Sequence, residues 1–409
     1  MKFLNYDKLE KDHINGLDVY LVNSKDSKFM IDFYVKTGAF DLNAYRNNKL
    51  VKFKTGIHHF IEHSLFMKEN YDSMEIFNDL GLKCNASTGY FSTNYYISGS
   101  SNFEEGFKYL IDLVVNPYFS QKNVKKERGI IYQEYKLGKD DISTELGEKV
   151  LKMLFHKYPL NKSIVGTSRD ILGMTYRDLE ECYNTYYDYS NMVLLVASNY
   201  SKKKVMDILK KELPYKESQK VEKYNYKEKE DVVKKRDVLK SKITSNNKLL
   251  ISYKIKNQGD IYKNSLLLDI YLSLLFGNTS QFYEYITLNN LATNFSFSLS
   301  SIKDFIVIDF WMDTSYADIL KEQIEKVLKE EVSEEDFLKK KQVCLDHLCL
   351  VSEKAESIIY FLVDNLENFG EIKPSQDQDV KNLKYQDLKK VKKLLANKKE
   401  VVLKVEKTF

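Results

Sequence analysis

The chain has 409 residues, of which 43% are hydrophobic and 30% charged, a balance typical of soluble globular proteins that excludes intrinsic disorder. This length exceeds what one ordinary hydrophobic core organises, so two or more domains are expected. The formal net charge of +4 is small beside 63 basic and 59 acidic residues, and the basic residues are mostly Lys. That composition gives no support to nucleic acid as a partner.

Targeting and redox features are sparse. The first residues carry a charge every few positions, and no stretch reaches 18 uncharged apolar residues, so neither a signal peptide nor a membrane span is expected. The cysteines lack CxxC spacing, which fits neither a zinc knuckle nor a disulfide framework. Of the four cysteines, Cys84, Cys182, Cys344 and Cys349, the last two are five residues apart in a helical pattern and are expected to be reduced core thiols. These features predict a cytoplasmic protein.

Hydrophobic periodicity predicts an α+β order in the first half. Alternating and β-rich runs in the first 45 residues read as strands, and the pattern then changes to helical spacing. A strand hairpin, KCNASTGYFSTNYYISGS, follows two short helices, and NMVLLVASN is a short buried strand. The longer helices are expected at about 102–115, 121–155 and 175–188.

The second half repeats this order. Residues 216–238 are densely charged with little apolar periodicity and are expected to be a linker. After it come a strand, two helices, the hairpin NFSFSLSSIKDFIVIDFWMD and further helices, with long ones at about 316–330, 333–370 and 385–396. The prediction is two duplicated α+β domains, 1–215 and 239–409, each a mixed or antiparallel sheet packed with helices.

The stretch GIHHFIEHSLF contains three of the six histidines. At helical spacing His59 and His63 lie on one face, and two imidazoles at i,i+4 can share one Zn²⁺ at about 2.0–2.1 Å each. Glu62 stands beside that face, where a carboxylate can deprotonate a water. The competing interpretation is an amphipathic core helix, but the order HxxEH favours a metal site. His58, about 100° away from His59, is expected to have a structural or supporting role.

A catalytic zinc site needs a third protein ligand. The helical pattern NVKKERGIIYQEYKLGKDD offers Glu127 and Glu134, two turns apart on one face, with Ile130 and Ile131 between them. Carboxylates at a buried surface need partners, and a metal supplies one. The alternative is that Glu127 pairs with a Lys and Glu134 is exposed, so these residues alone leave the third ligand open.

HFIEH, followed by ERGIIYQE roughly 70 residues later, resembles the pitrilysin/insulinase family of inverted zinc metallopeptidases. The resemblance implies one Zn²⁺ per chain bound by His59, His63 and Glu134, with Glu62 as general base and Glu127 supporting the site. It extends through GLKCNASTGYFSTNYY and NMVLLVASN across most of the first half, and more weakly through the order of elements in the second. It also implies a fold that forms half of a clamshell dimer.

The resemblance implies a peptide substrate as well. GLKCNASTGYFSTNYY is similar to the family's substrate-binding edge strand, so an extended peptide is expected to pair with Asn85, Ala86, Ser87 and Thr88. The expected reaction is hydrolysis of a peptide bond, in which zinc activates a water and Glu62 moves its proton. Without the zinc motif, an ordinary hairpin strand would be preferred here.

One departure from the family concerns the second half. Active members carry an Arg and, seven residues later, a Tyr, which reach the substrate. In SQFYEYITLNNLATNFSFS the aligned positions hold Thr287 and Asn294, and Tyr283 and Tyr285 are out of register. The chain is therefore predicted to be the catalytic subunit of a heterodimer, in preference to a homodimer, with a homologous subunit that lacks zinc supplying the Arg and Tyr.

Two alternatives stay open. The first is a catalytically silent scaffold or peptide-binding subunit of the same fold, which the intact HFIEH motif argues against. The second is a purely structural zinc site, but such sites usually have four protein ligands with Cys among them, and Cys84 is the only nearby thiol. Precursor maturation and peptide degradation are equally compatible with the sequence.

Overall fold

A computed structural model describes residues 9–46, 48–217 and 219–408. The chain divides into two compact units, and each combines segments from distant parts of the sequence. Unit 1 runs to Lys139 and also contains Tyr158–Tyr226 and Cys349–Glu367. Unit 2 contains Asp140–Lys157, Lys227–Leu348 and the residues from Asn368 onward.

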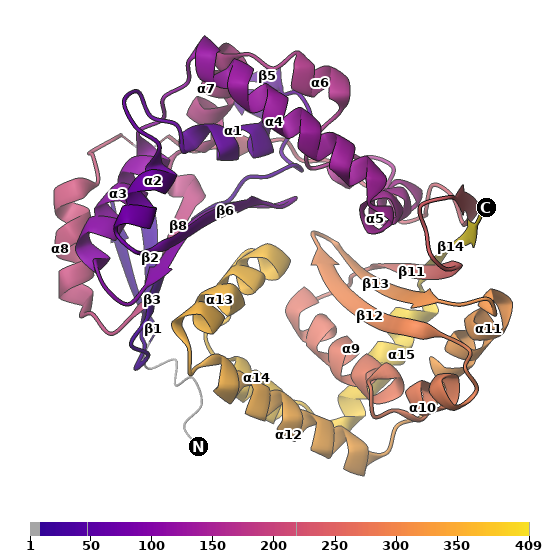
Figure 1. Ribbon diagram of the computed structural model, residues 1–409. Helices are drawn as coiled ribbons and strands as arrows, with labels where there is room; N and C mark the ends of the chain where they lie inside the picture. The colour runs from indigo at the N-terminus through magenta and orange to yellow at the C-terminus, as the bar shows by residue number, and fades with distance from the viewer. Residues whose placement is uncertain (1–8, 47, 218, 409) are drawn as a thin grey trace. The chain divides into compact units, whose positions relative to one another are not determined.

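A six-stranded sheet forms the centre of unit 1. Its strands alternate apolar and polar residues or are apolar throughout, and only β2 and β8 run parallel. The helices α2, α3 and α8 lie beside this sheet (Figure 1). In spatial order the strands are β1 (Leu9–Ile14), β2 (Leu17–Asn23), β8 (Met192–Ser198), β3 (Phe29–Val35), β7 (Thr93–Gly99) and β6 (Lys83–Thr88).

The remaining elements of unit 1 surround this sheet. A small sheet has the order β5 (Lys49–Lys52), β4 (Asn43–Arg46), β9 (Glu222–Lys223). The helices are α1 (Ile57–Leu65), α2 (Ser73–Asp79), α3 (Phe103–Val115), α4 (Gln121–Asp140), α6 (Ser168–Leu172), α7 (Tyr176–Tyr186), α8 (Lys202–Glu212) and most of α13 (Ala355–Phe369).

Unit 2 repeats the sheet of unit 1 without its first strand. Its order is β10 (Arg236–Ser241), β14 (Lys399–Lys407), β11 (Lys248–Lys256), β13 (Phe305–Asp313), β12 (Thr293–Ile302), and only β10 and β14, which correspond to β2 and β8, run parallel. The matching strand order confirms the predicted duplicated α+β fold. Its helices are α5 (Ile142–Leu154), α9 (Ile261–Phe276), α10 (Gln281–Leu288), α11 (Ala317–Val327), α12 (Glu334–Val351), α14 (Gln376–Asn382) and α15 (Leu388–Ala396).

The two longest predicted helices, 121–155 and 333–370, are each broken in two. Asp141 interrupts the first, because its carboxylate accepts the backbone N–H groups of Ser143 and Thr144 and so caps a new helix, α5. The second break separates α12 from α13. Each break lets the following helix join a different unit: α5 belongs to unit 2, and α13 belongs mainly to unit 1.

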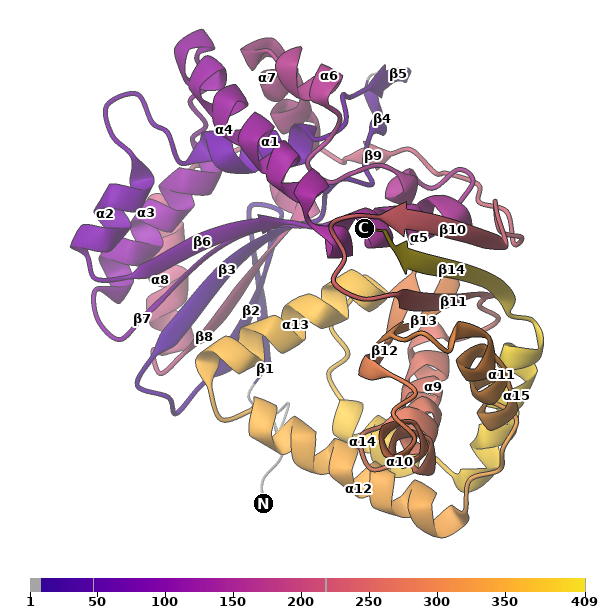
Figure 2. The same ribbon diagram turned by 45° about the vertical axis from the view of Figure 1, so that its right-hand side comes forward.

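Helix α13 lies beside the sheet of unit 1 (Figure 2), over the face that contains Asp32 and Ser98. Glu356 and Glu367, at opposite ends of the helix, accept hydrogen bonds from Ser98 at 3.1 Å and Ser92 at 2.6 Å. Beneath the helix, Asp32 on β3 is 2% exposed, and its Oδ1 has no hydrogen-bond partner among the described residues. The face therefore contains polar side chains that no solvent reaches.

The stretch expected to be a linker, 216–238, contains ordered contacts. It includes β9, which pairs with β4, and Glu228, whose side chain is fully buried. Oε1 of Glu228 accepts a hydrogen bond from Nζ of Lys254 at 3.0 Å, and the rings of Phe155 and Phe305 lie 4.6 and 4.7 Å from the same ammonium. The boundaries 1–215 and 239–409 stay a prediction.

No helix among the described residues has both the length and the apolar character needed to cross a bilayer.

Candidate metal centre

Helix α1 begins where only glycine fits. Gly56 has φ +80°, and a Cβ at this position would lie 2.1 Å from the carbonyl oxygen of Val165. Thr55, just before it, donates its hydroxyl to Asp170 at 2.5 Å. The start of α1 is therefore held against the loop that precedes α6.

The buried face of α1 contains Ile57, Phe60, Ile61 and Leu65, which join the main hydrophobic core of unit 1. His58 is also buried, and its Nε2 lies 3.1 Å from the carbonyl oxygen of Asp41. Its Nδ1 lies 4.0 Å from Sγ of Cys182, so both ring nitrogens have neighbours within unit 1. The packing fixes the rotation of the helix about its axis.

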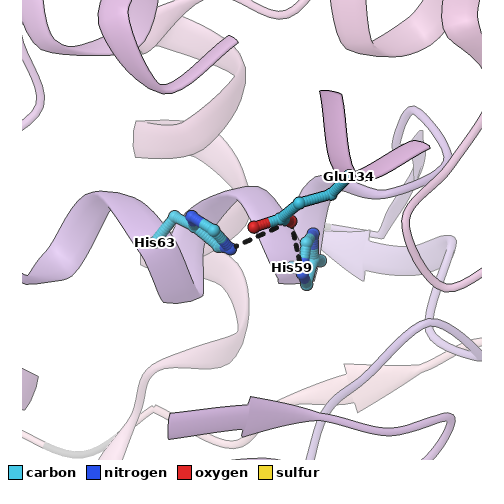
Figure 3. A group of neighbouring side chains, drawn as sticks. All are labelled: His59, His63 and Glu134. Atoms are coloured by element: carbon cyan, nitrogen blue, oxygen red, sulfur yellow. Dashed lines mark ion pairs between the residues drawn. The ribbon is translucent and has the colours of Figure 1, made fainter. Parts of the chain in front are cut away.

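His59 and His63 lie side by side on the opposite part of α1, with ring centroids 4.7 Å apart. Glu134 of α4 points between them (Figure 3). Its Oε2 lies 3.7 Å from Nε2 of His59 and 3.5 Å from Nε2 of His63. One potential ligand atom from each of these three residues lies within 4.8 Å of the others.

Glu127 contacts the other nitrogen of the His63 ring. Its Oε2 is 3.4 Å from Nδ1 of His63, and its side chain is 7% exposed. The face of α4 that is buried contains Val124, Glu127 and Ile131, whereas Ile130 is 41% exposed. The expectation that both isoleucines lie between the carboxylates on a buried face is therefore wrong for Ile130, because a 100° step per residue turns it to solvent.

The electrostatics of the group suit a cation. Burial, with a contribution from His63, lowers the pKa of His59 to about 3, so this imidazole is neutral and one of its two nitrogens has a lone pair available to accept a hydrogen bond or bind a metal. Its Nδ1 is buried and has no hydrogen-bond partner among the described residues. For His63, burial lowers the pKa, but the hydrogen bond to Glu127 and the charges of Glu134 and Glu62 outweigh it and raise the pKa overall.

Glu62 lies on α1 between the two histidines and is 9% exposed. Burial raises its pKa, against the opposing effects of a hydrogen bond from Thr88 and the charge of His63. Oγ1 of Thr88 donates to Oε2 of Glu62 at 2.6 Å. No local pattern in the sequence predicts this contact, since Thr88 is expected from the sequence only on the substrate strand.

Strand β6 carries the four residues expected to meet a substrate. It is the last strand in the order of its sheet and pairs with β7. The side chains of Asn85 and Ser87 are exposed, and those of Ala86 and Thr88 are partly buried. Nδ2 of Asn85 donates to the hydroxyl of Tyr96 at 3.2 Å. The free edge of β6 can therefore accept another extended chain.

In unit 2 the helix equivalent to α1 is α9, which has no histidine and is buried over most of its surface. The two residues at the positions of the family's Arg and Tyr form hydrogen bonds within unit 2. Oγ1 of Thr287 donates to the carbonyl of Tyr283 at 2.8 Å, and Nδ2 of Asn294 donates to Asp313 at 3.1 Å. Neither side chain carries the positive charge of an Arg or the phenol group of a Tyr.

Comparison with known proteins assigns the family. The family model described as insulinase, peptidase family M16, matches residues 20–168, and the model described as peptidase M16 inactive domain matches residues 173–344. The "Uncharacterized zinc protease YmfH" of Bacillus subtilis (strain 168) is 32% identical over 326 residues, which are 77% of this chain and 76% of that protein. The chain belongs to the M16 family. The resemblance predicted from HFIEH and ERGIIYQE is thereby confirmed.

Two further comparisons show a partial sequence similarity and a shared fold. The mitochondrial-processing peptidase subunit beta of Rattus norvegicus is 25% identical over 205 residues, 48% of this chain and 40% of that protein. A crystal structure described as an M16-like peptidase from Alicyclobacillus acidocaldarius superposes with a TM-score of 0.91 at 22% identity, covering 98% of both chains. The M16 fold is thus present over nearly the whole chain.

Proposed function

We propose that this chain is a zinc-dependent metalloendopeptidase that cleaves peptides or a peptide precursor inside the closed chamber of a dimer. The observation that carries the proposal is the convergence of His59, His63 and Glu134 within 4.8 Å, with Glu62 on the same helix. The name of the Bacillus subtilis relative, a zinc protease, supports the choice of metal.

The residues fit a zinc ion. Two neutral imidazole nitrogens and one carboxylate form a ligand set used by catalytic zinc sites, which keep a further position open. The Nε2 atoms of His63 and His59 lie 3.5 and 3.7 Å from Oε2 of Glu134, close enough that all three residues would need only small shifts to surround one ion. The group has three members among the described residues and includes no cysteine, which distinguishes it from a closed structural site.

Zinc, when bound, lowers the pKa of a water and polarises a peptide carbonyl. Glu62 accepts the proton of the attacking water and passes it to the leaving amine, and the raised pKa makes this carboxylate a stronger base than an exposed one. Glu127 keeps Nδ1 of His63 engaged, so that Nε2 faces the metal.

A substrate is proposed to lie extended along the free edge of β6, at Asn85, Ala86, Ser87 and Thr88. Pairing through backbone hydrogen bonds selects an extended conformation more than a sequence. Unfolded peptides and precursor segments meet this requirement, whereas folded proteins do not.

A homologous subunit is proposed to complete the site. Thr287 and Asn294 offer neither a positive charge nor a phenol, and both are already hydrogen-bonded within unit 2. The rat relative is named as one subunit of a peptidase, which agrees with an enzyme of more than one chain. A second, non-zinc chain would then contribute the Arg and Tyr.

The test of this proposal is metal analysis combined with the substitution Glu62→Gln. We expect the native complex, purified through a tag on this chain, to contain one zinc per chain and to cleave a quenched fluorogenic peptide library. Glu62→Gln should keep the zinc and lose at least about 100-fold in kcat, because one proton transfer has no acceptor. Wild-type protein with zinc but no turnover would overturn the enzymatic proposal.

The alternative is a catalytically silent subunit of the same fold. It is favoured by the Thr287 and Asn294 pair and by the match of residues 173–344 to a domain named as inactive. Under this alternative, the library peptides bind to the native complex with equal affinity in wild type and Glu62→Gln, and neither is cleaved.

A further inference from the structure

A hydrogen bond between Thr88 and Glu62 joins the substrate strand, β6, to the helix that carries the histidines, α1. Oγ1 of Thr88 lies 2.6 Å from Oε2 of Glu62, a short distance typical of a hydroxyl donating to a carboxylate. The carboxylate has two oxygens, so this bond occupies Oε2 and leaves Oε1 able to accept a proton from a water.

We propose that Thr88 is a positioning residue, whose hydroxyl holds the Glu62 carboxylate in the orientation required for proton transfer. This inference rests on the proposed peptidase function. It gives Thr88 a task separate from the backbone pairing with substrate proposed for β6.

The turn after Thr88 is held from three sides. Gly89 donates its N–H to the carbonyl of Ser92 at 2.9 Å, which closes the turn between β6 and β7. The carbonyl of Gly89 accepts the N–H of Ala39 at 3.0 Å. Oγ of Ser92 donates to Glu367 of α13 at 2.6 Å. The position of the Thr88 hydroxyl is therefore set before any substrate arrives.

One short loop, residues 38–41, contacts both this turn and α1. Ala39 holds the carbonyl of Gly89, and the carbonyl of Asp41 in the same loop lies 3.1 Å from Nε2 of His58 on α1. The packing is tight, since a Cβ on Gly38 would approach the Gly89 carbonyl oxygen to 2.5 Å. The loop thus fixes both the hydroxyl and the base relative to each other.

This arrangement has a chemical purpose. A buried glutamate has several rotamers, and a displacement of about 1 Å at a catalytic group costs about 100-fold in rate. A single hydroxyl donor restricts Glu62 without blocking its second oxygen. A Lys or Arg at position 88 would form an ion pair with Glu62 and lower the basicity of its carboxylate. A neutral hydroxyl lowers that basicity less.

The experiment compares Thr88→Val, Thr88→Ser and the control Thr93→Val in the native complex. Valine has the shape of threonine without the hydroxyl, and serine keeps the hydroxyl. Thr93 is paired with Thr88 across the hairpin, but its hydroxyl donates to the carbonyl of Thr37 at 2.9 Å and not to Glu62. Kinetics are measured with one quenched fluorogenic peptide that the wild-type complex cleaves, and zinc is measured per chain.

We expect Thr88→Val to lower kcat by about 10- to 100-fold with KM and zinc content unchanged. Thr88→Ser should restore kcat to within a few-fold of wild type, and Thr93→Val should keep it. If Thr88→Val does not fold, Thr88→Ala, which relieves the packing of the second methyl group, should show the same loss of kcat.

Three results would overturn the inference. One is an unchanged kcat in Thr88→Val, and another is a rise in KM alone, which would leave Thr88 only a substrate contact. The third is an equal loss in Thr93→Val, which would assign the effect to the hairpin. An inactive wild-type complex is a separate outcome: it would refute the proposed function, and with it the reaction that Thr88 is proposed to serve.

Discussion

Oε2 of Glu127 lies 3.4 Å from Nδ1 of His63, while Nε2 on the other side of the same ring lies 3.5 Å from Glu134. The imidazole is therefore held between two carboxylates that lie two turns apart on one face of α4. Because Glu127 engages Nδ1, it selects the tautomer that presents the Nε2 lone pair to a metal. This contact predicts that Glu127, which is not itself one of the proposed ligands, controls how tightly the site binds zinc.

Glu127→Ala is expected to weaken zinc binding by about 10- to 100-fold, because His63 loses the group that orients its ring. Competition with a chromogenic chelator measures the affinity. Activity at saturating zinc should fall much less than affinity. Glu181→Ala, which removes an exposed carboxylate from α7, is the matched control and should leave zinc affinity unchanged. Equal affinity in wild type and Glu127→Ala would refute the role of Glu127.

Glu134→Gln is expected to remove zinc from the chain under conditions in which Glu62→Gln retains it. An amide is a poor zinc ligand, and only two imidazoles would remain. Metal analysis after dialysis gives the stoichiometry. The apo protein made with a chelator should melt at a lower temperature than the zinc form, because a metal that binds only the folded state stabilises it by mass action. A variant that keeps full zinc occupancy would exclude Glu134 as a ligand.

Asp32→Asn is expected to stabilise the protein at neutral pH. Burial, reinforced by the charge of Glu367, raises the pKa of Asp32 well above its usual value. The folded chain therefore keeps a proton that the unfolded chain releases above a pH of about 4. The stability that this site contributes is complete at low pH and is lost as the pH rises through the raised pKa.

The measurement is thermal unfolding of wild type and Asp32→Asn between pH 5 and pH 8. The amide has no proton to lose, so the melting temperature of the variant should exceed that of wild type by about 2–4 °C or more at pH 8, and the gap should shrink toward pH 5. Asp79→Asn, at an exposed position of α2, serves as the control and should show no such trend. A variant less stable than wild type at pH 8 would contradict the prediction.

Glu228→Ala is expected to destabilise unit 2 by about 3–5 kcal/mol, since it leaves the ammonium of Lys254 buried without its counter-charge. Both side chains are fully buried, and the ammonium also donates to the carbonyl of Leu154 at 2.9 Å. The double variant Glu228→Gln with Lys254→Met should recover part of the loss. Urea denaturation followed by fluorescence gives the free energies of unfolding. A double variant no more stable than Glu228→Ala would contradict this account.

Local spacing was enough to predict the histidine pair, because the positions of His59 and His63 on one helical face depend only on the geometry of the helix. The predicted neighbours Glu127 and Glu134 depend on how α4 packs across α1, and here the family resemblance carried the prediction. No sequence pattern near Thr88 or Glu62 predicts the contact between them. It arises from the turn geometry of a hairpin and a loop that lie far from α1 in sequence.

The breaks after α4 and α12 were missed for a related reason. Apolar periodicity continues through both, so a single long helix is the natural prediction for 121–155. The capping carboxylate of Asp141 decides against it, and a capping residue within a charged stretch is easily overlooked. Likewise the dense charge of 216–238 suggested a linker, although one of its carboxylates, Glu228, is buried against Lys254.

The exchange of helices between the halves of the sequence has a consequence for synthesis on the ribosome. The backbone N–H of Ala355 donates to Asp26, a contact that spans 329 residues, and α13 completes the sheet face that contains Asp32. Unit 1 therefore cannot reach its final structure while the first half is the only part translated, even though domains commonly fold in order as they emerge. A gene fragment that ends at the middle of the chain encodes the zinc motif but leaves the sheet face around Asp32 uncovered in water.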